Sequence, residues 1–245
     1  MTESLPNGPE PLLSIVTVVK NAKETIFETL ESVPESPEIE FIVIDGNSTD
    51  GTRQLLESKS DLIDVLVSEE DDGLYYAMNK SIQLAHGKFI LFLNADDYLS
   101  RDGFLKALEV LRKHQDNSNF ILVGDIQIVG SENILHVPIS DLAKRMVPHP
   151  GTFMALQLVK SLSGFNTTFR VAADYDLLLR AKKSGADMRQ LKEVITFHRK
   201  GGYSSTHTRR SINETLVIQI SHSKANMPYS FGLFLKSIVR LWWDA

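Results

Sequence analysis

The sequence predicts a single-domain α/β protein whose mostly parallel, Rossmann-like sheet is sandwiched by helices. Its length of 245 residues fits one such domain. Short runs that are apolar throughout follow one another along the first half of the chain, which is typical of strands covered on both faces. Helical patterns separate these runs, and strand–helix alternation favours a doubly wound sheet.

The expected strands are the apolar runs between turn-forming residues. The first is broken only by Ser14 and Thr17 and is rich in β-branched residues. A late strand is expected at residues 194–198. The first run is residues 12–19, and the others are residues 41–44, 65–67, 89–93, 120–123 and 126–129.

The expected helices follow apolar residues at spacings of three and four. One stripe starts at Tyr75 and a second at Phe104, with Ser100 or Asp102 placed to cap the second. Residues 147–153 are predicted to be loop-like, and residues 199–210 to form a basic loop. The helical ranges are residues 49–58, 75–85, 104–111 and 174–183.

The composition excludes several classes of protein. A hydrophobic share of 42% is that of an ordinary globular protein, and 26 basic against 31 acidic residues leave no basic surplus for nucleic acid. The absence of cysteine excludes disulfides and thiolate metal sites and favours a cytoplasmic location. No apolar run approaches the roughly 20 residues of a spanning helix. Residues 1–11 contain three prolines and are expected to form a disordered lead.

Carboxylates at three places carry the chemical argument, because ligands of open α/β sheets bind beyond the carboxyl ends of the strands. Asp45 ends the second run, where it can accept hydrogen bonds from a nucleoside or shape a plain turn. Asp96 and Asp97 follow a buried run; a divalent cation would relieve their repulsion, and capping of the next helix is the alternative. Asp174 lies near a helix start, as a general base or as a favourable first-turn charge.

Four segments in order resemble the family 2 glycosyltransferases, in the bacterial branch that assembles capsule, exopolysaccharide and O-antigen units. The resemblance extends over residues 12–205. Its segments are residues 14–21, 43–52, 72–80 and 85–97, the last of which ends in Asn94-Ala95-Asp96-Asp97.

The resemblance implies a GT-A fold, a nucleoside-diphosphate sugar donor, Mg²⁺ or Mn²⁺, and inversion at the anomeric carbon. Thr17, Asp45 and Asp72 match donor positions, with UDP expected as the nucleotide. Asn94 and Asp96 match the two ends of the Asp-x-Asp motif. The first residue of the motif is an amide here, so the resemblance assigns donor binding to Asn94 and Asp97. It assigns metal binding to Asp96 and His198.

The catalytic base implied by the resemblance is Asp174. The glutamate that precedes this aspartate in the family is Ala173 here, and Asp176 is the fallback. His149 resembles a segment near the acceptor site and is given no chemical role. Residues 199–205 are expected either to close over the diphosphate or to form a solvated loop.

The predicted organisation has a donor half at residues 12–130, an acceptor half at 131–205 and a helical tail at 206–245. An apolar stripe at residues 231–243 suits a peripheral contact with the inner face of the membrane, a dimer contact or core packing. The expected acceptor is a glycan or a polyprenyl-diphosphate-linked saccharide. A catalytically inactive nucleotide-sugar-binding module, or a partner subunit of that kind, is the alternative function.

Overall fold

Four parallel strands form the N-terminal half of the sheet. The computed structural model describes residues 10–201 and 207–222. The four strands stand in the order β3-β2-β1-β4, and nearly every residue of β1, β2 and β4 is buried. The predicted parallel arrangement is therefore confirmed here. The strands are β1 (Leu13–Val19), β2 (Ile39–Asp45), β3 (Val65–Ser68) and β4 (Phe89–Phe92).

Helices surround this half of the sheet. α3 packs against β1 and β2, whereas α4 packs against two strands of the other half, β6 (Phe120–Ile128) and β9 (Asp187–His198). Ser100 precedes α4, but it makes no side-chain capping hydrogen bond. The second helix begins at Thr52 and not at residue 49, because Gly51 adopts a left-handed conformation with φ 100°. The elements are α1 (Ile26–Ser32), α2 (Thr52–Ser58), the 3₁₀ turn η1 (Ser60–Leu62), α3 (Leu74–Leu84) and α4 (Arg101–Lys113).

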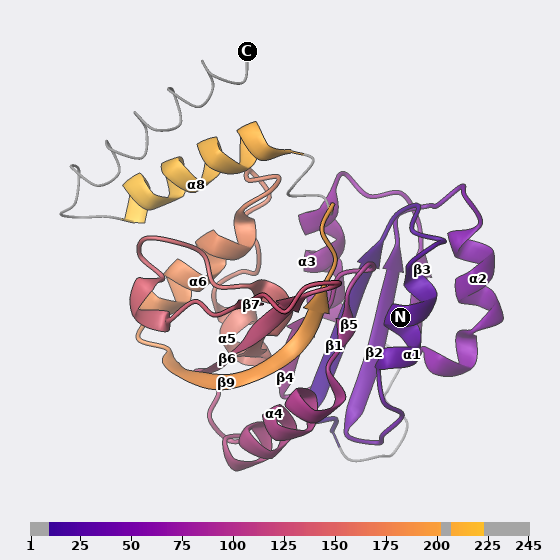
Figure 1. Cartoon of the computed structure of the whole chain (residues 1–245), viewed down its shortest axis with the longest axis horizontal. Coiled ribbons are helices and arrows are strands. Elements are labelled where there is room, and N and C mark those ends of the chain that lie inside the picture. The colour runs from indigo at the N-terminus through magenta and orange to yellow at the C-terminus, as the bar shows by residue number, and fades with distance from the viewer. Residues whose placement is uncertain (1–9, 202–206, 223–245) are drawn as a thin grey trace.

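The C-terminal half of the sheet mixes parallel and antiparallel pairs. β8 (Thr152–Ala155) lies antiparallel between β4 and β6 (Phe120–Ile128), and β6 runs parallel to β9 (Asp187–His198). The two predicted runs at 120–129 are thus one strand, and the late strand is longer than expected. β9 curves around this half of the molecule (Figure 1). Two short strands complete the sheet: β5 (Tyr98–Leu99), paired with β9, and β7 (Ile134–Leu135), paired with β6.

Residues 147–153 are more ordered than the predicted loop. They contain the 3₁₀ turn η3 (His149–Gly151) and the start of β8, whose residues are all buried. This segment brings the side chain of His149 to the end of β4, which it contacts through Asn94. A further 3₁₀ turn, η2 (Ile139–Asp141), precedes it.

Three helices complete the C-terminal half, and α8 packs on α6 at the end of the molecule opposite α2 (Figure 1). Glu214 of α8 accepts hydrogen bonds from the backbone N–H groups of residues 170–172, at 2.8–3.1 Å. These bonds fix the chain just before α6. The helices are α5 (Leu156–Ser161), α6 (Ala173–Lys183) and α8 (Thr208–His222).

Among the described residues, no helix combines the length and the hydrophobicity that crossing a bilayer requires. The stripe at residues 231–243 lies outside the described residues, as do residues 1–9 of the predicted lead and residues 202–205 of the predicted lid.

Candidate active site

The loops that follow β1, β2 and β4 lie together at the carboxyl ends of these strands and are joined by hydrogen bonds. Asn21 donates its backbone N–H to the hydroxyl of Ser48 at 2.8 Å. The hydroxyls of Thr25 and Thr29 donate to the backbone carbonyls of Ala95 and Asp97, at 3.0 and 2.7 Å. The carboxyl ends of these parallel strands therefore form a single rim.

The two candidate donor residues on β1 and β2 are buried within this rim. Asp45 is the last residue of β2, and its carboxylate accepts hydrogen bonds from the backbone N–H of Ser48 at 3.2 Å and from the hydroxyl of Ser68 at 2.6 Å. It thereby holds the turn at residues 46–48. Thr17 is fully buried, and its hydroxyl has no hydrogen-bond partner within the part of the chain that the structure describes.

The Asp97 carboxylate is the centre of the cluster after β4. The side chain is fully buried, and it accepts the Nδ2–H of Asn94 at 2.8 Å and the backbone N–H of Arg199 at 3.0 Å. The Nδ1 atom of His198 lies 3.0 Å from the same carboxylate. This hydrogen bond raises the pKa of His198, although partial burial opposes the charged form. Asp97 therefore orients both Asn94 and His198.

The Asp96 carboxylate is half-buried beside Asp97. Burial, and next the negative charge of Asp97, raise the pKa of Asp96. Within residues 10–201 and 207–222, no side chain donates a hydrogen bond to it, and no three His, Cys, Asp or Glu side chains converge as a complete cation site. A cation would relieve this repulsion, and the His198 ring has its Nδ1 engaged by a carboxylate, as metal-binding histidines commonly do. The chemistry of Asp96 and His198 fits a divalent cation, which would need further ligands beyond the described side chains.

Asp174 lies in the first turn of α6 and is 6% exposed. Its Oδ1 accepts the backbone N–H of Tyr175 at 2.9 Å and lies 3.1 Å from the hydroxyl of Tyr75. The one proton of this hydroxyl is shared with the backbone carbonyl of Val171, which lies 2.8 Å away. Burial, and next the charge of Asp174, raise the pKa of Tyr75, so this phenol stays protonated and donates. The Oδ2 atom lies 2.8 Å from Nδ1 of His149, and it keeps a second lone pair.

His149 joins Asp174 to the cluster after β4, because its Nε2 lies 3.1 Å from Oδ1 of Asn94. Sequence reasoning assigned this histidine no role in chemistry. Asp176, the fallback base, is instead paired with Arg180 at 2.7 Å and with His222 of α8 at 2.9 Å. These contacts give Asp176 a structural role between α6 and α8.

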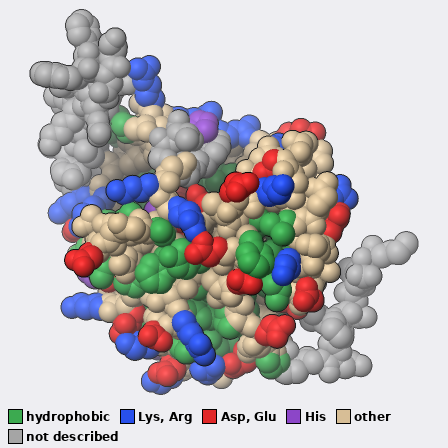
Figure 2. Space-filling view, turned by 45° about the vertical axis from the view of Figure 1, so that its right-hand side comes forward, with side chains coloured by type: hydrophobic (Ala, Val, Ile, Leu, Met, Phe, Trp, Pro, Cys, Tyr) green, Lys and Arg blue, Asp and Glu red, His purple; other side chains and the backbone are tan. Residues whose placement is uncertain are grey.

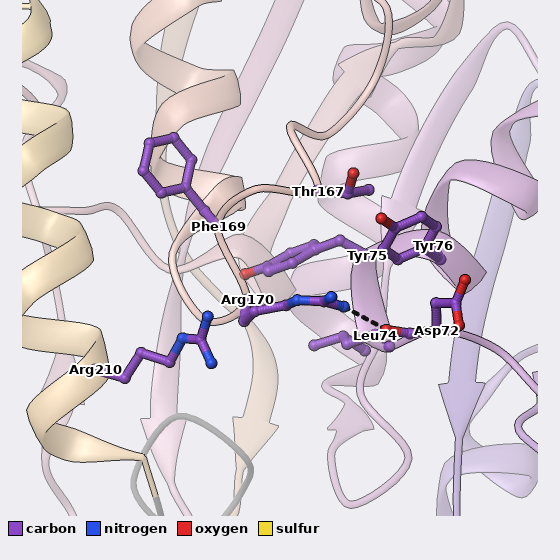
Figure 3. Close-up of a pocket in the computed structure, with 9 residues that line it drawn as sticks. Asp72, Leu74, Tyr75, Tyr76, Thr167, Phe169, Arg170 and Arg210 are labelled. Carbon is purple, nitrogen blue, oxygen red and sulfur yellow. Dashed lines mark hydrogen bonds between the residues drawn. The ribbon is translucent and has the colours of Figure 1, made fainter.

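A cavity of about 340 Å³ opens beside Tyr75. Arg170 reaches across it to donate to the backbone carbonyl of Asp72, and Arg210 is directed toward the same space from α8 (Figure 3). The Arg170 guanidinium lies 5.4 Å from the ring centre of Tyr76. Aromatic rings with polar side chains around them suit a saccharide. The lining residues are Asp72, Gly73, Leu74, Tyr75, Tyr76, Thr167, Phe169, Arg170 and Arg210.

Basic and acidic side chains are interspersed over the face of the molecule drawn in Figure 2. This face presents no broad surface of one charge, in keeping with the slightly acidic composition of the chain.

Two solved structures share this fold. S. aureus TarS (residues 1–349), in complex with UDP-GlcNAc, matches 92% of this chain and 71% of its own with a TM-score of 0.69 and 17% identity. The mannosyltransferase PcManGT from Pyrobaculum calidifontis, in complex with GDP-Man and Mn²⁺, matches 96% of this chain and 73% of its own with a TM-score of 0.67 and 19% identity. These likenesses show the predicted GT-A fold.

The chain belongs to the glycosyl transferase family 2, whose model matches residues 14–178. A relative by sequence is TuaG of Bacillus subtilis (strain 168), a glycosyltransferase with a provisional role in teichuronic acid biosynthesis. The two are 37% identical over 107 residues, which is 42% of each chain. The predicted family is therefore confirmed.

Proposed function

We propose that this glycosyltransferase moves a sugar, with inversion, from a nucleoside-diphosphate sugar to a hydroxyl of a saccharide acceptor. One observation carries the proposal: the carboxylates after β4 and at the start of α6 are connected through Asn94 and His149. The group proposed to bind the leaving diphosphate and the group proposed to take the proton of the attacking hydroxyl thus belong to one hydrogen-bonded site, as a single displacement requires.

The donor is expected at the rim of β1, β2 and β4. The complexes of TarS with UDP-GlcNAc and of PcManGT with GDP-Man support a nucleotide-sugar donor, and UDP is our first choice of nucleotide. Thr17 and Asp45 stay the candidate donor residues at this rim, whereas Asp72, the third donor candidate from the sequence, lines the cavity beside Tyr75. Because Asp45 is fully buried, we expect it to act through the turn at residues 46–48 that it holds.

Asp96 and Nε2 of His198, which makes no hydrogen bond within the described residues, would hold Mg²⁺ or Mn²⁺ together with oxygens of the donor. When bound, the cation supplies Lewis-acid stabilisation of the departing diphosphate. Asp97 keeps the His198 ring in place, and Asn94 contributes to the donor side of the site through its contact with Asp97. The Mn²⁺ in the PcManGT complex supports this assignment.

Asp174 is the proposed base, and its Oδ2 receives the proton of the acceptor hydroxyl as the new glycosidic bond forms. The acceptor occupies the cavity next to Tyr75, since this residue both lines the cavity and donates to Asp174. A glycan or a polyprenyl-diphosphate-linked saccharide of cell-surface polysaccharide synthesis, such as an O-antigen or lipopolysaccharide unit, is the proposed acceptor. The role of TuaG supports this class, which would place the enzyme in the cytoplasm or at the inner face of the membrane.

Thermal-shift screening of nucleotide sugars with and without Mn²⁺ tests the donor. The preferred donor should raise the melting temperature more when the ion is present, because a ligand that binds only the folded state stabilises it more the more tightly it binds. Calorimetry of Asp96→Ala should show weaker Mn²⁺-dependent binding. Unaltered affinity would remove Asp96 from the site.

Product analysis tests the chemistry. NMR of the first product should show the anomeric configuration opposite to that of the donor, and retention would contradict the direct displacement. The alternative, an inactive nucleotide-sugar-binding module, predicts donor binding without any release of nucleoside diphosphate.

A further inference from the structure

Five polar side chains form one continuous hydrogen-bonded chain through the site. The successive separations are 2.8 Å from Asp174 Oδ2 to His149 Nδ1, 3.1 Å from His149 Nε2 to Asn94 Oδ1, and 2.8 Å from Asn94 Nδ2 to Asp97 Oδ2. Nδ1 of His198 lies 3.0 Å beyond. The members come from α6, η3, the loop after β4, and β9.

The direction of these hydrogen bonds follows from the two carboxylates. Asp97 has only acceptor oxygens to offer, so the group of Asn94 that faces it is the NH₂. The amide oxygen of Asn94 then faces His149, and Nε2 must donate to it. Nδ1 faces the Asp174 carboxylate at 2.8 Å. The His149 ring therefore links the Asn94 amide to Asp174.

We infer that Asn94 and His149 are positioning residues that hold the Asp174 carboxylate in register with Asp97 and His198, and that position 94 requires an amide. This inference rests on the proposed function for its meaning in catalysis. Its geometry belongs to the free protein and can be tested there.

Only an amide satisfies both neighbours of position 94. It donates to the fully buried Asp97 on one side and accepts from His149 on the other. An aspartate at this position could still accept from His149, but its oxygen would face that of Asp97 without a proton between them. Two carboxylates in such contact repel each other, and a buried acceptor loses its donor. The asparagine in the first place of the Asp-x-Asp motif thus has a physical reason.

Exchange of the two side chains gives the sharpest test. Asn94→Asp should lower the melting temperature by about 5 °C or more, since a hydrogen bond to a buried charge is lost. In the double variant Asn94→Asp, Asp97→Asn, the amide at 97 donates to the carboxylate at 94 and still accepts the N–H of Arg199. The double variant should recover at least half of the decrease in melting temperature that Asn94→Asp causes.

The second readout is ¹⁵N NMR of the histidine rings in the full-length protein without ligand. The Nε2 atom of the His149 ring should carry a proton, because it faces the amide oxygen of Asn94 at 3.1 Å. The His149 signals are identified by their loss in His149→Asn. His86→Asn is the matched control. His86 also pairs through Nδ1 with a buried carboxylate, that of Glu40 at 2.7 Å, but at the start of β2 and away from the site. It should leave these signals unchanged.

Three results would overturn the inference. They are an Asn94→Asp protein as stable as wild type, a double variant no more stable than Asn94→Asp, and a His149 ring whose Nε2 carries no proton. None of these measurements needs a donor or an acceptor. Failure of the hydrogen-bonded chain and failure of the proposed transferase activity are therefore separate outcomes.

Discussion

Glu214 should be among the most sensitive positions outside the site. It is 9% exposed and accepts three backbone N–H groups from residues 170–172. A hydrogen bond to a charged acceptor contributes roughly 1.5–3 kcal/mol, and entering water replaces part of it when the carboxylate is removed. Glu214→Ala should therefore cost about 3–5 kcal/mol, which lowers the melting temperature by roughly 6–20 °C in a domain of this size.

Glu214→Gln separates charge from geometry. One carboxylate oxygen accepts from Val171 and Ala172, and the other accepts from Arg170 and from the Arg210 side chain. The single oxygen of glutamine can keep the first two bonds, whereas its NH₂ would face the donors of the other two. An intermediate loss of stability is expected. A melting temperature equal to that of wild type would refute the reasoning.

The pH dependence of Glu214 has a definite sign. Burial opposes its charged form, but the N–H of Arg170 and the hydrogen bond of Arg210 outweigh it, so the pKa of Glu214 is lowered. A lowered pKa gives stability that is present above the unfolded value of about 4.3 and is lost as the pH falls through the folded value. The difference in melting temperature between wild type and Glu214→Gln should shrink in acid.

Glu57→Ala is the control for differential scanning calorimetry, because Glu57 forms an exposed ion pair with Arg53 within α2. Such pairs contribute roughly 0–1 kcal/mol, so the melting temperature should change little. If Glu214→Ala melts within about 2 °C of this control, the three backbone hydrogen bonds do not hold the loop before α6.

Two further predictions concern packing and the cavity. A Cβ at Gly103 would lie 1.9 Å from the backbone carbonyl oxygen of Val194. Gly103→Ala should therefore force α4 away from β9 and lower the free energy of unfolding by about 3 kcal/mol or more. Gly46→Ala is the control, because its Cβ would make only ordinary contacts, and it should melt near wild type. A Gly103→Ala protein of native stability would contradict this packing. Arg170→Gln should raise KM for the acceptor several-fold and leave donor affinity within about twofold in calorimetry, since Arg170 lines the cavity. A change confined to donor affinity would assign the cavity to the donor.

The strands of the N-terminal half were predictable because each is apolar throughout. Asp45 was expected at the end of a strand and is the last residue of β2. Helix α1 was missed because its buried residues are only Ile26, Thr29 and Leu30, too few for a clear apolar stripe. β8 was missed because Pro148, Pro150 and Gly151 precede it and are typical of loops.

Prediction of the site was limited in the same way. Asp96, Asp97 and Asp174 were expected from their places after a strand and at a helix start. The structure connects Asp97 to Asp174 through Asn94 and His149, and Asp96 lies beside Asp97. The role of His149 depends on the insertion of β8 between β4 and β6. His149 lies 55 residues along the chain from Asn94, the residue that it contacts. Sequence spacing alone carries no signal for that contact.

The most direct measurement compares Asp174→Asn with wild type in two assays on the same nucleotide sugar. The account predicts that donor affinity with Mn²⁺ stays within about twofold, whereas transfer to the acceptor falls by at least about a hundredfold, since a general base contributes roughly 10²–10⁴ in rate. Turnover at the wild-type rate would contradict the account, because the proton of the attacking hydroxyl would then go elsewhere.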